Sequence, residues 1–345
     1  MSTIKIGLIG FGGINKAMAN RCYENGWEVA FNTRSSGIYK GETSELLAPL
    51  SELKHYCQRS GLSAASLAIS GNDDGKKEME YIGYVLDAGI PIVLFGKGPR
   101  ANYGAELKRL EDLMGSMIGQ CATCGGGTMM MPYAKMRNIE NVYSFDFSAN
   151  GSCNSAWNDL SEGMPPEDVF LKAQKAHTLE PGSASFHEAI MAEACGDVPR
   201  KAVIFSKELG ICKEEFRAKD IVCAPFHEDE FNQVVREASD WRLIVTLRRR
   251  GEVGCAGIAM TKVSFENWNL FFGWRNIKEE VQLQRLVGPG TSNTLVIEHY
   301  GALEPIILQG PGAGTLQTSL AGEAELRGLL ARFYPPEMLM RKKRS

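Results

Sequence analysis

The sequence has no long hydrophobic run. No stretch of its 345 residues approaches the roughly 20 consecutive apolar residues that a membrane-spanning helix needs. The N-terminus also lacks the charged and apolar segments of a secretory signal peptide, because Met1-Ser2-Thr3 leads directly into a strand-like run. We therefore expect a cytoplasmic protein with no membrane partner.

An excess of charge of one sign is also missing. The 38 Lys and Arg residues against 41 Asp and Glu residues give a formal net charge of -3, so the chain as a whole is not attracted to nucleic acid. Internal repeats and low-complexity segments are absent as well. Hydrophobic residues make up 44% of the chain, which is enough for a sizeable core, and the length suggests two domains.

Patterns typical of metal ligands are few. The nine cysteines are an odd number scattered through a long chain, which fits reduced thiols better than a framework of disulfides. Cys121 and Cys124 have CxxC spacing, but no second pair of ligands accompanies them. The five histidines show no metal-ligand spacing. We therefore expect no metal.

The sequence does contain an alternation of strand and helix patterns up to about residue 140. A β-rich run at 4–9 is followed by apolar residues at helical spacing over 14–22. Further strand-like runs and helical patterns then follow in turn, the strands at 27–31, 67–69 and 92–95 and the helices at 79–89 and 107–114. This alternation predicts an α/β fold, a Rossmann domain with a doubly wound parallel sheet, over residues 1–140.

The pattern changes near residue 141. Aromatic residues at 143, 145 and 147 alternate with polar ones, as in a half-buried antiparallel strand. Helical stretches at 154–176 and 198–209 precede strand-like runs, which stand at 243–247, 257–263 and 294–299. These separate blocks predict an α+β substrate domain over residues 141–305. A last helix at about 316–331 suggests that the segment 306–345 returns to the Rossmann domain.

A glycine-rich turn lies between the first predicted strand and helix. Gly10 permits a tight turn, and Gly12 lets the backbone approach a pyrophosphate at the helix N-terminus. Asn15 stands where the dinucleotide fingerprint has its third glycine, a position that serves helix–strand packing. This replacement weakens the match to the dinucleotide fingerprint, but it leaves the predicted phosphate site in place. The predicted cofactor-binding residues of this turn are Gly10, Phe11, Gly12, Gly13, Ile14 and Asn15.

The end of the second predicted strand selects the cofactor. A carboxylate at this position would bind the ribose hydroxyls of NAD, but the chain has Asn32-Thr33-Arg34-Ser35-Ser36. Arg34 can pair with the 2′-phosphate of NADP, with Ser35 and Ser36 as further donors. We therefore predict NADP as the preferred cofactor and NAD as the alternative; the competing interpretation is that Arg34 is a solvated loop residue.

Further segments, in conserved order along the chain, resemble homoserine dehydrogenases. They are Lys97-Gly98-Pro99, Asn150-Gly151-Ser152-Cys153-Asn154, Glu180-Pro181, Asp197-Val198-Pro199-Arg200-Lys201, and Gly310-Pro311-Gly312-Ala313-Gly314 followed by Thr318. The resemblance implies an NAD(P)-dependent oxidoreductase that moves a hydride between nicotinamide and a small hydroxy or carbonyl compound. It also implies a homodimer formed through the sheet of the substrate domain.

The resemblance implies catalytic roles as well. Lys201, with Lys97, would handle the hydroxyl proton of the substrate. Asp197 and Glu180 would hold the substrate amine or orient Lys201. The residues themselves support part of this, because Asp197 and Lys201 are four apart and share one helix face. Asp197 follows Gly196 and can also cap the helix N-terminus.

Other residues would line the two binding sites. The resemblance places Gly151 and Ser152 in the substrate pocket and Gly312 near the cofactor. The aspartates that usually follow Glu-Pro in the family are missing after Pro181. Since a buried ammonium needs carboxylate partners, we expect poor turnover of homoserine and better turnover of a related hydroxy or carbonyl compound. His187 and Glu188 are possible additions to the pocket.

Two alternatives stay open. One is an enzyme of the same type acting on a substrate that is not an amino acid. The other is a protein that binds dinucleotide without catalysis and reports redox state to a partner. The presence of Lys97, Asp197 and Lys201 argues against the second.

Overall fold

The computed structural model describes residues 3–69, 74–115, 117–119, 139–176, 178–179, 182–252, 254–312 and 314–339. It divides into two compact units. The first contains Met1–Gly127 and Thr315–Ser345, and the second contains Thr128–Gly314. The predicted fold class, a Rossmann domain with an α+β domain, is confirmed. Of the segment 306–345, residues 306–311 form a strand of the second unit, and the chain re-enters the first unit at Thr315.

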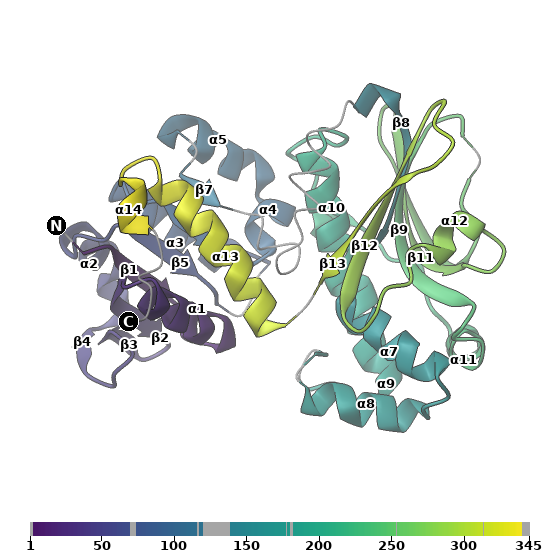
Figure 1. Ribbon diagram of the computed structural model, residues 1–345, viewed down its shortest axis with the longest axis horizontal. Helices are drawn as coiled ribbons and strands as arrows, with labels where there is room; N and C mark the ends of the chain where they lie inside the picture. The colour runs from purple at the N-terminus through teal and green to yellow at the C-terminus, as the bar shows by residue number, and fades with distance from the viewer. Residues whose placement is uncertain are drawn as a thin grey trace. The chain divides into compact units, whose positions relative to one another are not determined.

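The first unit is built on a seven-stranded sheet in the order β4-β3-β2-β1-β5-β6-β7 (Figure 1). Pairing is parallel from β2 to β7. The strands are β1 (Lys5–Ile9), β2 (Glu28–Arg34), β3 (Gly37–Lys40), β4 (Leu46–Ala48), β5 (Ala64–Leu67), β6 (Ile92–Leu94) and β7 (Ile118–Gly119). The helices are α1 (Gly13–Glu24), η1 (Leu50–Glu52), α2 (Leu53–Arg59), α3 (Lys76–Asp87), α4 (Gly98–Asn102), α5 (Gly104–Met114), α13 (Thr315–Leu330) and α14 (Pro336–Leu339).

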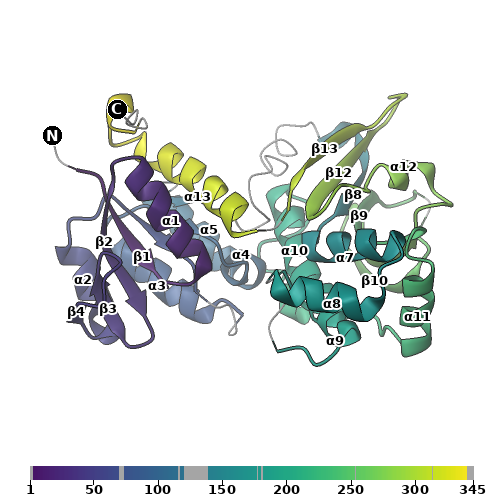
Figure 2. The same cartoon turned by 60° about the horizontal axis from the view of Figure 1, so that its bottom comes forward.

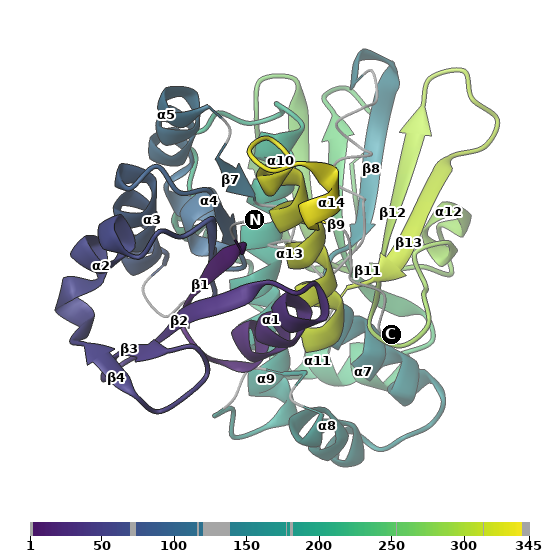
Figure 3. The same cartoon turned by 60° about the vertical axis from the view of Figure 1, so that its left-hand side comes forward.

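Helices cover both faces of this sheet. On one face α1 and α13 lie side by side, as Figure 2 shows, and bury Met18, Leu326 and Leu330 against β1. On the other face α2, α3 and α5 bury Leu53 and Ile82, and Figure 3 shows α2 and α3 on the side of β1 and β2 away from α13. The predicted return of the last helix to the Rossmann sheet therefore supplies one of its two apolar layers.

The sequence reading missed an antiparallel hairpin. β2 does not lead into a crossover helix; it turns at Ser35-Ser36 and pairs with β3 as Arg34↔Gly37, and β4 follows antiparallel to β3. The sheet thus has two antiparallel strands, β3 and β4, at one edge that the sequence pattern did not predict. The prediction of β5 at 67–69 is also displaced, since the strand ends at Leu67.

The second unit is a six-stranded antiparallel sheet in the order β10-β11-β9-β8-β12-β13. Its strands are β8 (Val142–Ser148), β9 (Trp241–Arg249), β10 (Ile258–Ser264), β11 (Trp268–Asn276), β12 (Ser292–His299) and β13 (Ile306–Pro311). Its helical elements are η3 (Ile139–Asn141), α7 (Gly151–Ser161), α8 (Pro166–Lys175), α9 (Phe186–Ala192), the π-helical turn η4 (Glu193–Asp197), α10 (Val198–Glu208), η5 (Ala218–Asp220), α11 (Glu228–Arg236) and α12 (Val281–Gln284). The single helix predicted at 154–176 is wrong, because Gly163, at φ +90°, and Pro165 separate α7 from α8.

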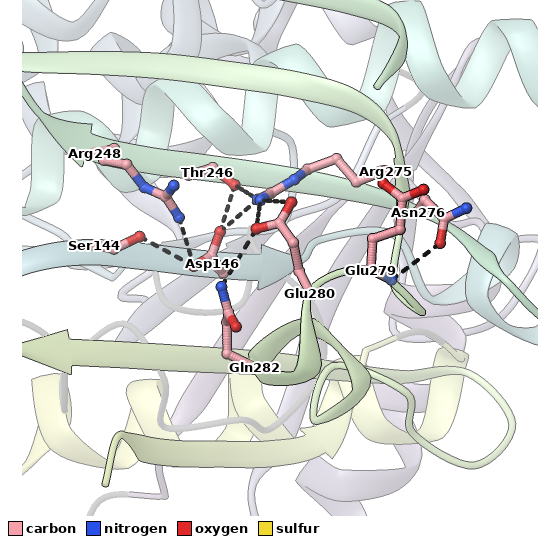
Figure 4. Close-up of polar contacts among 9 residues, drawn as sticks. All are labelled: Ser144, Asp146, Thr246, Arg248, Arg275, Asn276, Glu279, Glu280 and Gln282. Atoms are coloured by element: carbon pink, nitrogen blue, oxygen red, sulfur yellow. Dashed lines mark hydrogen bonds and ion pairs between the residues drawn. The ribbon is translucent and has the colours of Figure 1, made fainter. Parts of the chain in front are cut away.

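The two faces of this sheet differ in character. Phe145 and Phe147 of β8 pack on Phe205 of α10 and form the apolar face. Asp146 points to the opposite face, where Arg275 donates to it at 2.9 Å and Ser144 at 3.0 Å (Figure 4). This second face also carries Arg248 and Thr246 as partners of Asp146, and α12 covers part of it.

Candidate active site

Gly10 forms a tight turn between β1 and α1. Its φ is +82°, and a Cβ at this position would lie 2.2 Å from the backbone oxygen of Ala68 at the end of β5. Its amide donates to Thr33 Oγ1 at 2.8 Å. Only glycine fits both the backbone angle and the close approach, so the turn has the shape that the dinucleotide fingerprint requires.

Gly12 is the N-cap of α1, and no side chain caps the helix there. A Cβ on Gly12 would have no neighbour within 4 Å among the described residues, and one on Gly13 would meet only Thr315, at 3.7 Å. The first amides of α1 therefore border open space with the positive end of the helix dipole behind them. A pyrophosphate fits this cradle.

Asn15 replaces the third glycine of the fingerprint without opening the turn. It is fully buried, and its amide donates to the carbonyls of Ile9 at 2.9 Å and Gly10 at 2.7 Å. Ser66 Oγ donates in turn to Asn15 Oδ1 at 2.6 Å. The side chain fills the space that glycine leaves empty, so it supports the phosphate loop from beneath.

Arg34 lies at the mouth of a cavity of about 390 Å³ beside this turn. Its guanidinium carbon is 5.3 Å from the ring centre of Phe11 and 4.8 Å from that of Tyr39, and it donates to Asn32 and to the backbone of Thr43. Two aromatic faces thus hold the cation in place. The cavity is lined by Gly10, Phe11, Gly12, Thr33, Arg34, Ser35, Leu50, Ala68, Ile69, Lys77 and Tyr81.

The remaining cofactor predictions fall around this cavity. Ser35 lines it, whereas Ser36 Oγ lies 2.7 Å from Tyr39 Oη on the same hairpin. Ile14 packs partly buried against the core beneath α1. Gly312 belongs to the second unit, where a Cβ would collide with the buried amide of Asn293 at 2.1 Å; packing within that unit is sufficient reason for a glycine at this position.

Lys201 and Asp197 form a buried ion pair in the second unit. Lys201 Nζ lies 2.8 Å from Asp197 Oδ2, and the two side chains are 6% and 14% exposed. The same ammonium donates to the backbone oxygen of Ala149 at 2.8 Å. The two residues therefore form a buried pair and not a solvated ion pair on the surface.

Glu193 is a residue of this cluster that sequence reasoning missed. It is 6% exposed, and the amide nitrogen of Asn150 donates to it at 2.6 Å and to Asp197 at 3.0 Å. Asn150 also caps α7 by accepting from the amide of Cys153. The spacing of four residues from Glu193 to Asp197, and again to Lys201, was the signal in the sequence that could have identified it.

A π-helical turn brings these side chains together. α9, η4 and α10 form one continuous helical rod, and η4 (Glu193–Asp197) is its wide turn. Pro199 lies two residues after the end of this turn. It has no amide proton, and in a regular α-helix its ring would clash with the carbonyl of Cys195. The wider turn accommodates the proline. π turns of this kind are frequent at functional sites.

The prediction that Asp197 caps a helix is wrong. Its backbone is helical, with φ -72° and ψ -44°, and its side chain makes no capping bond. Helical residues lie on both sides of the π turn, so there is no free helix N-terminus at Asp197 to cap. Its carboxylate is instead committed to Lys201 and Asn150.

Gly151 and Ser152 begin α7 beside Asn150, and both are buried. Ser152 Oγ donates to the backbone oxygen of Thr178. Burial, with Glu193 and Asp197 nearby, raises the pKa of the Cys153 thiol well above its usual value, so that thiol stays protonated. Glu180 lies outside the described residues, as do Cys121 and Cys124.

Two further predicted residues do not join the cluster. His187 packs against Phe231, with ring centres 4.6 Å apart, and Glu188 accepts from the amide of Ala184 as part of the start of α9.

Lys97, in the first unit, precedes α4. Gly98 after it touches Gly75 so closely that a Cβ would lie 2.5 Å from that backbone, which explains a glycine after this lysine.

No family model matches the chain. A curated NAD(+)-dependent homoserine dehydrogenase from Pseudomonas canavaninivorans is 22% identical over 366 residues, covering 93% of this chain and 94% of the relative. The chain resembles homoserine dehydrogenases. The resemblance seen in the motifs is thus confirmed over nearly the whole length.

Solved structures agree with this homoserine dehydrogenase-like fold. The homoserine dehydrogenase of Thermoplasma acidophilum matches with a TM-score of 0.71 at 15% identity, over 96% of this chain and all of that one. A hyperthermophilic archaeal homoserine dehydrogenase in complex with NADPH matches with a TM-score of 0.68 at 19% identity, over 96% and 99% of the two chains. Both units are therefore part of the shared fold.

The described part of the chain has neither a membrane-spanning helix nor a cluster of metal ligands. None of its helices is long and apolar enough to cross a membrane. No group of three or more His, Cys, Asp or Glu side chains within it is placed to hold a metal ion.

Proposed function

We propose that this homoserine dehydrogenase-like chain is an NAD(P)-dependent oxidoreductase, with a small hydroxy or carbonyl compound as substrate. The observation that carries the proposal is the buried Lys201–Asp197 pair beside Asn150 and Glu193. A buried lysine with a defined partner is a suitable proton donor or acceptor. The phosphate cradle at Gly10–Gly12 supplies the second requirement, a place for the dinucleotide.

The cofactor would be held by the first unit. The amides at the start of α1 would bind the pyrophosphate, and Arg34 would pair with the 2′-phosphate of NADP. When bound, the nicotinamide ring supplies or accepts the hydride. NADPH in one structural neighbour and NAD(+) in the name of the curated relative support NADP with NAD as the alternative.

Lys201 would move the proton. Its ammonium has three N–H groups; one is used by Ala149 O and one by Asp197, which leaves one for a substrate oxygen. In reduction Lys201 donates a proton to the carbonyl oxygen, and in oxidation it takes the proton from the hydroxyl. Lys97 is the second acid–base candidate. Asp197 and Asn150 fix the direction of the Lys201 side chain.

The charge of the cluster favours a cationic group on the substrate. Glu193 and Asp197 place two carboxylates beside the single ammonium of Lys201. Carboxylates are the partners that a buried substrate ammonium needs. The expectation of poor homoserine turnover did not count Glu193. With Glu193 present, we infer that the substrate carries an amine, and homoserine is the leading candidate, with Gly151, Ser152 and Glu180 as further pocket residues.

A matched pair of substrates tests this proposal. Homoserine and 4-hydroxybutanoate differ only by the amine, so the ratio of their kcat/KM values with NADP(+) isolates the contribution of the carboxylates. We expect homoserine to be favoured at least 100-fold, since its amine can pair with the buried carboxylates and 4-hydroxybutanoate has no group that can. Equal kcat/KM values would reject the hypothesis that the substrate carries an amine. No turnover of either compound, or of a wider panel of hydroxy compounds, would reject the hypothesis that the chain is an oxidoreductase.

We also propose a homodimer, in which the Asp146 face of the second sheet meets its copy. Ile307 of β13 lies on this face and is 44% exposed. Helix α12 covers only part of the face. A second copy would cover the remainder and leave the sheet with helices on one side and a partner on the other.

A further inference from the structure

Two cysteines meet at the π turn of the candidate active site. Cys195 is exposed and occupies the middle of η4, two residues from Glu193 and two from Asp197. Cys223 is half-buried in the loop between η5 and α11. Its sulfur lies 3.8 Å from the backbone oxygen of Cys195. The two thiols therefore come from separate segments, 28 residues apart, and share one place on the surface.

The proximity of the two thiols makes one of them reactive. The neighbouring Cys223 side chain lowers the pKa of Cys195 to about 7, and the Cys195 side chain raises the pKa of Cys223. A thiol with a pKa near 7 is substantially ionised at neutral pH, and the thiolate is the nucleophile in disulfide exchange. Cys195 is thus an exposed nucleophile with a second thiol beside it.

The loop that carries Cys223 is held in place. The amide next to it, on Ala224, donates to Thr261 Oγ1 of β10 at 2.7 Å. Phe226 stacks on Trp274 of β11, with ring centres 5.7 Å apart. Both anchors fix the loop to the sheet, so Cys223 is presented to Cys195 by the fold.

Four other cysteines of the described chain lack this combination. Burial raises the pKa of Cys22 to about 12 and that of Cys57 to about 11, and it also raises that of Cys153. Cys255 is half-buried, and burial raises its pKa as well. Thiols that remain protonated react slowly with oxidants, so we expect the pair at the π turn to be oxidised before these four.

We propose that Cys195 and Cys223 form an oxidisable dithiol site whose disulfide displaces the π turn and slows turnover. The co-reactant is a low-molecular-weight disulfide of the glutathione type. The part of the proposal that concerns turnover rests on the proposed function. The formation of the disulfide and the displacement of the turn do not.

The chemistry balances in two exchange steps. The Cys195 thiolate attacks one sulfur of the small disulfide, which forms a mixed disulfide and releases one small thiolate. Cys223 loses its proton to solvent and attacks the sulfur of Cys195, which forms the protein disulfide and releases the second small thiolate. The two cysteines are oxidised by two electrons together, and the small disulfide is reduced to two thiols.

The geometry links this bond to the active-site cluster. A disulfide holds its sulfurs about 2.05 Å apart, closer than any nonbonded thiol contact. Because Ala224 and Phe226 anchor the loop to the sheet, the proposal places the movement in the π turn. Glu193 and Asp197 belong to that turn and both accept from Asn150, so the shift disturbs the carboxylates that would hold the substrate.

The test treats the purified full chain with oxidised glutathione, with and without later addition of dithiothreitol. We expect a Cys195–Cys223 cross-linked peptide in the mass spectrum, faster amide hydrogen exchange over residues 193–198, and a kcat/KM lowered at least five-fold. Dithiothreitol should restore all three. Cys223→Ser should retain its activity before treatment and, after it, accumulate glutathione on Cys195 with no cross-link. Cys255→Ser, the matched control, should behave as the natural chain.

Each outcome decides the proposal. Absence of the cross-linked peptide, or of any change in exchange over residues 193–198, would overturn it. A cross-link that leaves kcat/KM unchanged would overturn the effect on turnover. Should the untreated chain turn over no substrate, the proposed function fails alone, because the peptide map and the exchange data need no substrate.

Discussion

Lys201 Nζ lies 2.8 Å from Asp197 Oδ2, one helical turn earlier, and both side chains are nearly withdrawn from water. A buried ion pair of this kind is stable only where hydrogen bonds satisfy its remaining groups. Ala149 O accepts from the lysine, and Asn150 donates to the aspartate. Both come from the end of β8, so the junction of β8 with α7 holds the pair in one geometry.

Removal of the lysine should separate catalysis from cofactor binding. We expect Lys201→Ala to lower kcat at least 100-fold, the usual worth of a positioned acid–base group. It should also lower the free energy of unfolding by about 3–5 kcal/mol, because Asp197 loses its partner. NADPH affinity, measured by fluorescence titration, should be unchanged, since the phosphate cradle belongs to the other unit.

The control is Lys172→Ala, which breaks an ion pair with Asp159 in the same unit. The Lys172 side chain is 56% exposed, and exposed pairs contribute about 0–1 kcal/mol, so both kcat and stability should change little. If Lys201→Ala kept most of its activity, Lys201 would leave the mechanism and Lys97 would remain as the acid–base candidate.

Neutralising Glu193 should act on the substrate. Glu193→Gln keeps the side-chain oxygen that accepts from Asn150 and removes one negative charge. We expect KM for homoserine to rise at least ten-fold with a smaller change in kcat, and the rate with 4-hydroxybutanoate to stay level. Glu188→Gln, on the same helical rod, is the control, because that side chain only accepts from the amide of Ala184. An unchanged KM in Glu193→Gln would show that the substrate amine lies elsewhere.

Arg34 should determine the choice between NADPH and NADH. The natural chain should bind NADPH more tightly, and Arg34→Ala should bring the two dissociation constants together, because the guanidinium can pair with the extra phosphate. Arg59→Ala is the control; that side chain is 69% exposed and its nearest carboxylate is 3.7 Å away. A tenfold preference of the natural chain for NADH would contradict this assignment.

Asn15 should be required for stability although it replaces a glycine of the fingerprint. Asn15→Ala removes the hydrogen bonds that this side chain makes with the carbonyl of Gly10 and the hydroxyl of Ser66. The loss of such bonds costs about 1–3 kcal/mol, so the midpoint of urea unfolding should fall. Asn269→Ala on β11 is a suitable control, since its contact with Ser264 is exposed. A mutant as stable as the natural chain would mean that the turn does not depend on this side chain.

The oligomeric state tests the proposed use of the Asp146 face. Light scattering should give twice the chain mass of 37.9 kDa. Ile307→Asp should shift the equilibrium toward the monomer, because it places a charge on an otherwise apolar exposed position. A natural chain that remains monomeric at micromolar concentration would contradict the proposed dimer.

Local pattern was enough for much of the fold. Gly10 and Gly12 predicted the phosphate turn. Glycine permits the backbone angle and the close approach that this turn needs, and the glycines can be read directly from the sequence. Asp197 and Lys201 were predicted on one helix face, because helical spacing is also local. The parallel strands and the returning helix α13 followed from periodicity in the same way.

Tertiary structure decided what local spacing could not. Whether Asp197 and Lys201 form a surface pair or a buried one depends on β8 and α7, which lie about 50 residues away. Glu193 joined them only through Asn150 and a π turn next to Pro199, and periodic patterns assume regular turns. The contact of Cys195 with Cys223 likewise joins a helix to a loop. Strands β10 and β11, which come later in the sequence, anchor that loop beside the helix.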